Sequence, residues 1–250
     1  MKALQMEFFK CKRRAIWLPP LLMLAAQLAW GLWSFRGTLT VDELANGWRN
    51  LFYYFPLLNS MMTPVIAAVV ASRIADIEHK GQTLKLLETV QPTGCLFDAK
   101  FLCGACYMGV LVLVQAASIV ITGIVKGFDG AVPLDKIGLY IALNLLITLT
   151  IYLLQLVLSL LLQNQLIALI IGLIGSFLGL FSLFFPQAVQ RLLLWGYYGV
   201  LSFVWMSWDA TTRIASYVYV PVDRLGLVIL CVGAATLYFI GRHLFARKEV

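Results

Sequence analysis

The longest run of this sequence without a charged residue is IGLYIALNLLITLTIYLLQLVLSLLLQNQLIALIIGLIGSFLGLFSLFFPQAVQ, residues 137–190. A helix needs about 20 apolar residues to cross about 30 Å of membrane hydrocarbon. The run is too long for one such helix and suits two, with the polar residues Gln163, Asn164 and Gln165 at the turn between them. It therefore predicts two membrane spans, at residues 137–162 and 166–186.

Four further charge-free stretches of span length lie at residues 16–35, 51–72, 101–125 and 225–241. The whole chain of 250 residues is 61% hydrophobic and 12% charged, whereas a soluble domain carries about 25% charge. This composition excludes a water-soluble globule and a disordered chain. We expect an all-α polytopic membrane protein with six transmembrane helices in a single domain, residues 1–250.

The distribution of basic residues predicts the orientation of these spans. With both termini in the cytoplasm, 12 of the 19 Lys and Arg residues lie inside, as the positive-inside rule requires. A seventh span at residues 192–208 would export the basic C-terminus. We therefore expect residues 187–224, which are rich in aromatic side chains, to form an external or re-entrant segment. Residues 1–15 place Leu4, Phe8 and Cys11 on one face, which predicts an interfacial helix.

Several kinds of chemistry are missing from the sequence. No ionisable residue lies in the six spans, no phosphate-binding glycine loop occurs, and no His, Cys, Asp or Glu cluster has metal-ligand spacing. The excess of basic residues is explained by the membrane, and no nucleic-acid-binding motif is present. These features indicate a protein that is not an enzyme and has no metal or cofactor of its own. One alternative stays open, a membrane thiol oxidoreductase that uses Cys103 and Cys106, although small residues at this spacing also suit a helix contact.

The spans contain polar and small residues that are candidates for a pathway or for helix packing. Amide side chains occur at Gln27, Asn59, Gln115, Asn144 and Gln155; they either line a path or bond across helices. Gln27 and Asn59, with Trp195 and Trp205 of the aromatic segment, are the candidates for the pathway. A face of small residues, Gly172, Gly175, Ser176 and Gly179, permits close approach of a helix of this chain or of a second copy.

The segment between the second and third spans, residues 73–100, is the largest cytoplasmic loop of this topology. Gly81 is expected to break the helix that continues from the second span, and Pro92 with Gly94 to end a short helix that follows. Leu84, Leu87 and Val90 lie on one face of that helix, which suits docking in a groove of another protein. The alternative is an amphipathic turn that rests on the bilayer.

This loop resembles the one that follows the second span in type-two ABC exporter permeases. The resemblance is given by Glu78-x-x-Gly81-x-Thr83, by Leu86-Leu87, by Pro92 and by Lys100, and the six-span plan is similar as well. Within that family the chain looks most like the permeases of bacterial lantibiotic and bacitracin self-protection transporters.

The resemblance implies that ATP hydrolysis and transport are carried out by separate subunits of one complex. A separate cytosolic ATPase dimer would bind ATP and Mg, a second permease would complete the pathway, and the complex would sit in the bacterial plasma membrane. The ATPase-coupling residues would be Glu78, Gly81, Thr83, Leu84, Leu86, Leu87, Val90 and Pro92. The implied cargo is an antimicrobial peptide expelled from the membrane; a lipid, glycan or drug is the alternative, and a scaffold or sensor that moves no substrate is a further one.

Overall fold

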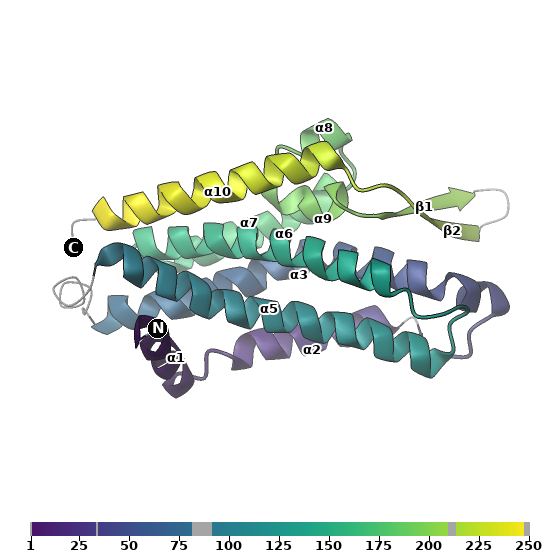
Figure 1. Ribbon diagram of the computed structural model, residues 1–250, viewed down its shortest axis with the longest axis horizontal. Coiled ribbons are helices and arrows are strands. Elements are labelled where there is room, and N and C mark those ends of the chain that lie inside the picture. The colour runs from purple at the N-terminus through teal and green to yellow at the C-terminus, as the bar shows by residue number, and fades with distance from the viewer. Residues whose placement is uncertain (1, 34, 82–91, 210–213, 248–250) are drawn as a thin grey trace.

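The computed structural model describes residues 2–33, 35–81, 92–209 and 214–247, and these residues are mostly helical. The long helices run side by side in one elongated bundle, and a two-stranded hairpin projects from one end (Figure 1). The helix α1 (Lys2–Arg13) and the C-terminal end of α10 (Arg224–Arg247) lie together at the opposite end (Figure 1). We call these two ends the hairpin end and the α1 end.

Among the described residues, five helices are long and apolar enough to cross a membrane. They are α3 (Val41–Gly81), α5 (Thr93–Lys126), α6 (Leu134–Leu161), α7 (Gln165–Ser182) and α10. Five of the six predicted spans lie in these helices, although α7 ends at Ser182 and not at Pro186. The predicted division of the longest charge-free run into two helices is therefore confirmed, with Asn164 capping α7 by accepting a hydrogen bond from the Leu166 N–H.

The first predicted span, residues 16–35, forms the shorter helix α2 (Leu18–Trp33). Its 16 residues extend about 24 Å, less than the roughly 30 Å of hydrocarbon. Figure 1 shows α2 running from α1 toward the hairpin end, beside α3 and α5. A sixth crossing therefore stays a prediction, and it would keep α1 and the end of α10 on the same side of the membrane.

The helix α3 is much longer than the span predicted within it. Its 41 residues extend about 60 Å, so it continues beyond the apolar stretch 51–72 at both ends. Thr40 and Glu43 form a capping box at its start, since each side chain accepts a hydrogen bond from the other residue's backbone N–H, at 3.3 and 2.8 Å. Its described part extends to Gly81, and the break predicted there stays a prediction.

The segment 187–224 contains an element that the sequence analysis did not predict. It forms the short helices α8 (Gln187–Gln190), η1 (Leu194–Gly196) and α9 (Tyr197–Val200), and then the antiparallel strands β1 (Val204–Asp209) and β2 (Ile214–Tyr219). The described chain is mostly helical, as expected, but the expectation of an all-α chain is wrong for these two strands, in which residues of high β propensity such as Val204, Trp205 and Tyr217 occur. The hairpin contacts the N-terminal part of α3 through Tyr53 and Tyr217, whose ring centroids lie 5.6 Å apart.

Candidate functional site

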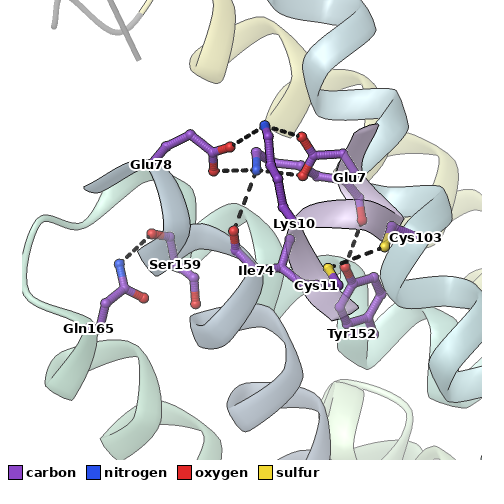
Figure 2. A network of polar contacts seen from close by, with 10 residues as sticks. Glu7, Lys10, Cys11, Ile74, Glu78, Cys103, Tyr152, Ser159 and Gln165 are labelled. Carbon is purple, nitrogen blue, oxygen red and sulfur yellow. Dashed lines mark hydrogen bonds and ion pairs between the residues drawn. The ribbon is translucent and has the colours of Figure 1, made fainter. Parts of the chain in front are cut away.

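A cluster of four charged side chains, three of them buried and Lys10 partly buried, lies at the α1 end of the bundle. Glu7 and Lys10 come from α1, Glu78 from the last turns of α3 and Lys100 from the start of α5. The Lys10 ammonium donates to Glu7 Oε1 at 2.7 Å and to Glu78 Oε1 at 2.9 Å. The Lys100 ammonium donates to Glu7 Oε2 at 2.9 Å and to Glu78 Oε2. Figure 2 shows the carboxylates of Glu7 and Glu78 on either side of the lysine ammonium groups.

The four groups form a closed and electrically balanced ring. The side chain of Lys100 is 0% exposed and those of Glu7 and Glu78 are 1% exposed. Such burial is tolerated only because each ion faces opposite charges and its hydrogen-bonding capacity is used. The third donor of Lys100 reaches the backbone oxygen of Ile74 at 3.4 Å. At Lys10, burial lowers the pKa, but hydrogen bonds to Glu7 and Glu78 outweigh it, so the pKa is raised.

Only one member of this ring, Glu78, belongs to the site predicted from the sequence. The missed signal lies in α1, where Glu7 falls between Leu4, Phe8 and Cys11 at helical spacing and therefore on the apolar face. A carboxylate on the face that docks against the bundle requires buried cationic partners. Their identity could not be obtained from the sequence, because Lys100 is 93 residues away in the chain.

The predicted ATPase-coupling residues divide between the described and the undescribed parts of the chain. Glu78 is in the ring, Gly81 is the last described residue of α3, and Pro92 immediately precedes α5. Gly94, expected to help end a short helix, lies in the first turn of α5. The others, Thr83, Leu84, Leu86, Leu87 and Val90, lie outside the described residues. The ring thus joins the two helices that flank residues 82–91, and it adds α1 to them.

A second polar cluster lies farther along the same helices and consists of amides. Asn59 of α3 accepts a hydrogen bond from Gln27 of α2 at 2.6 Å and donates one to Asn144 of α6 at 2.8 Å. Asn59 and Gln115 of α5 bond each other reciprocally, at 2.9 and 3.0 Å, and the Tyr140 hydroxyl donates to Gln115 Oε1 at 2.5 Å. All five side chains are buried. These amides therefore bond across four helices, as one of the two alternatives predicts.

The cavity beside the amide cluster is small. Its lining includes Gln27, Asn59, Gln115, Thr63 and Thr148, and its volume is about 20 Å³, which is room for roughly one water molecule. Gln27 and Asn59 were expected to line a pathway. In the described chain they lie next to a cavity that is far too narrow for a peptide.

The two tryptophans expected on the pathway lie in different surroundings. Trp195, in η1, packs against α7, and Trp205, on β1, is 65% exposed on the hairpin. The structure does not bring them together with each other or with the amide cluster.

The small-residue face of α7 packs within the same chain. A Cβ atom at Gly172 would lie 2.5 Å from Ala68 Cβ, and one at Gly179 would lie 2.6 Å from the Ser60 backbone oxygen, both on α3. A Cβ at Gly175 would overlap the Trp195 indole. The Ser176 hydroxyl donates to the Met61 backbone oxygen of α3. The four residues together let α7 approach α3 and Trp195 closely.

The two cysteines of the thiol oxidoreductase alternative, Cys103 and Cys106, have different environments. Cys103 is buried and Cys106, one turn later in α5, is exposed. The neighbour of Cys103 is instead Cys11 of α1, with 3.6 Å between the two sulfur atoms. This arrangement gives the thiol oxidoreductase alternative no support.

Comparison with known proteins identifies the chain. Residues 3–179, more than two thirds of its length, match the model of a family described as ABC-2 family transporter protein. The matched stretch includes every residue of the charged ring and of the amide cluster. No curated protein matches the chain. From the match and from the apolar helices that surround the two polar clusters, we conclude that this chain is a multi-pass membrane protein of the ABC-2 transporter family.

Proposed function

We propose that the chain is the permease subunit of an ATP-driven exporter that expels a cationic, amphipathic peptide of the lantibiotic type from the membrane. A separate cytosolic ATPase dimer would bind ATP and Mg and would dock at the α1 end. The observation that supports this proposal most directly is the charged ring, which connects α1 to α3 and α5, the two helices that flank residues 82–91 in the sequence.

The position of the ring suits the transmission of force. An ATPase that displaces residues 82–91 would pull on α3 and α5, and the ring would carry α1 with them. The same two helices hold the amide cluster, because Asn59 lies 19 residues before Glu78 in α3 and Gln115 lies 15 residues after Lys100 in α5. At 1.5 Å per residue these separations correspond to about 28 and 22 Å. Movement at the α1 end would therefore reach the middle of the membrane through continuous helices.

The pathway would lie between two permeases and not inside one chain. A cavity of about 20 Å³ cannot pass a peptide, whereas the lipid-facing sides of α2 and α5 expose large apolar residues such as Trp30, Leu113 and Ile121. A second permease, identical or similar, placed against such faces would enclose an apolar path that an amphipathic peptide could enter from the lipid. A lipid, glycan or drug of similar amphipathic character is the second candidate cargo.

The first experiment tests cargo and partner together. We would express the chain with the ATPase and permease genes adjacent to it, purify the complex, and measure ATPase activity in vesicles with a lantibiotic or with bacitracin. We expect copurification of the ATPase, stimulation by the peptide, and raised peptide resistance that an ATPase-inactive partner abolishes. Stimulation only by lipids or drugs would assign the second cargo class. Absence of both copurification and altered sensitivity would contradict the proposal.

The second experiment tests orientation in the bacterial plasma membrane. A tag placed after Val250 should react only with reagents admitted to the cytosol, because both termini are proposed to lie inside. Labelling of intact cells from outside would contradict the six-span topology.

A further inference from the structure

We propose that Cys11 and Cys103 form a modification site, at which a hydroperoxide joins the two thiols in a disulfide that staples α1 to α5. Neither residue belongs to the exporter machinery proposed above. Both are fully buried, and their sulfur atoms lie 3.6 Å apart beside the charged ring (Figure 2).

The approach that the bond requires is short. A disulfide has a sulfur–sulfur distance of about 2.05 Å, so the two atoms must close by about 1.5 Å from the observed 3.6 Å. The helices are already in contact around the thiols, because Phe8 packs against Tyr107 with ring centroids 6.2 Å apart, and Lys100 is bonded to Glu7. Rotation of the side chains with a small shift of α1 would therefore bring the sulfurs together.

The surroundings of the two thiols favour Cys11 as the nucleophile. The hydrogen bond shared with Cys103 lowers the pKa of Cys11 and outweighs burial, which would raise it. The thiolate is the species that reacts with peroxides. The Cys11 sulfur would attack one peroxide oxygen, the O–O bond would break, and one water would leave, so that Cys11 becomes a sulfenic acid. The Cys103 sulfur would then attack the Cys11 sulfur, the S–O bond would break, and a second water would leave. Overall, two thiols lose two electrons and two protons, and one hydrogen peroxide becomes two waters.

The other three cysteines provide a contrast within the same chain. Cys95, Cys106 and Cys231 are all exposed. Cys106 is only three positions after Cys103 in α5, yet it is exposed where Cys103 is buried. Spacing in the sequence favours Cys103 with Cys106, whereas the structure pairs Cys103 with Cys11, which is 92 residues away.

The experiment uses the full chain in lipid nanodiscs with Cys95, Cys106 and Cys231 replaced by Ser. After hydrogen peroxide the intact mass should fall by about 2 Da, the loss of two hydrogens, and a reductant should restore it. Proteolytic fragments should contain Cys11 joined to Cys103. The matched control keeps Cys11 and Cys106 and carries Cys103→Ser, and it should form no internal disulfide. The disulfides of the wild-type chain are mapped in parallel, so that the conclusion does not depend on any substitution.

Two results would overturn the proposal. One is that Cys11 and Cys103 both remain free thiols under peroxide that oxidises the exposed cysteines of the wild type. The other is a wild-type disulfide between Cys103 and Cys106. A second measurement uses the effect of the disulfide on stability. In the variant Lys100→Met, which breaks the charged ring, oxidation should raise the unfolding temperature. An unchanged unfolding temperature would also contradict a disulfide that joins α1 to α5.

Discussion

Replacing Lys100 with Met should destabilise the chain far more than loss of an ordinary surface lysine. Methionine fills a similar volume, but it leaves the buried carboxylates of Glu7 and Glu78 with Lys10 as their only cation in the ring. Removing one partner of a buried ion pair costs about 3–5 kcal/mol, because the remaining charge stays desolvated. Lys100 contacts two carboxylates and is 0% exposed, so we expect a loss within that range.

Lys136→Met is the matched control. Lys136 pairs with Asp135 at 3.1 Å, but their side chains are 33% and 72% exposed, and such surface pairs contribute about 0–1 kcal/mol. The free energy of unfolding would be measured in mixed micelles by tryptophan fluorescence. The double variant Glu7→Gln with Lys100→Met should recover part of the loss, because Lys10 and Glu78 then balance each other. Equal losses for Lys100→Met and Lys136→Met would refute the argument that the ring is a desolvated, mutually dependent unit.

Three further predictions concern packing, coupling and pH. Gly175→Leu should destabilise the chain by about 1–3 kcal/mol or more through overlap with the Trp195 indole, whereas Gly233→Leu, which meets nothing within 4 Å, should have little effect in the same unfolding assay. Leu87→Asp should leave ATP hydrolysis by the complex intact and abolish transport in vesicles; unchanged coupling would remove Leu87 from the docking face. The Arg191 guanidinium lowers the pKa of Asp223 from its ordinary value of 3.8, so this pair should stabilise the chain above that pH and lose its contribution as the pH falls through the lowered pKa. Arg191→Gln should remove that part of the acid dependence, and an unchanged profile would show that the pair contributes nothing.

The helices were predictable because their signal is local. A charge-free run of span length has few stable forms in lipid other than a helix, since every backbone polar group must be bonded within the segment. The turn at residues 162–164 was equally local, because short polar residues interrupt helices. The hairpin was missed for a related reason. Trp205, Trp208 and the tyrosines around them suit a membrane interface as well as a strand, and each strand is only six residues long.

Only some features of the candidate functional site could be predicted from the sequence. Glu78 was expected to contribute to coupling because of its place in a loop pattern, but its partners come from α1 and α5. The amides were recognised as polar groups in apolar spans, and the structure shows that Asn59 bonds to three other helices. From the sequence, Trp195 was a candidate for the substrate pathway; in the structure its indole packs against Gly175.

The sequence by itself determined that this chain resides in a membrane, where its helices lie, and that its spans contain no ionisable residue. These conclusions depend on composition and on spacing along the chain. Only the tertiary structure decided that Glu7, Lys10, Glu78 and Lys100 form one ring, in which Lys10 alone is partly exposed, and that Cys103 faces Cys11. The physical reason is that a buried ion or thiol is defined by what surrounds it in space, and these partners are as many as 93 residues apart in the chain.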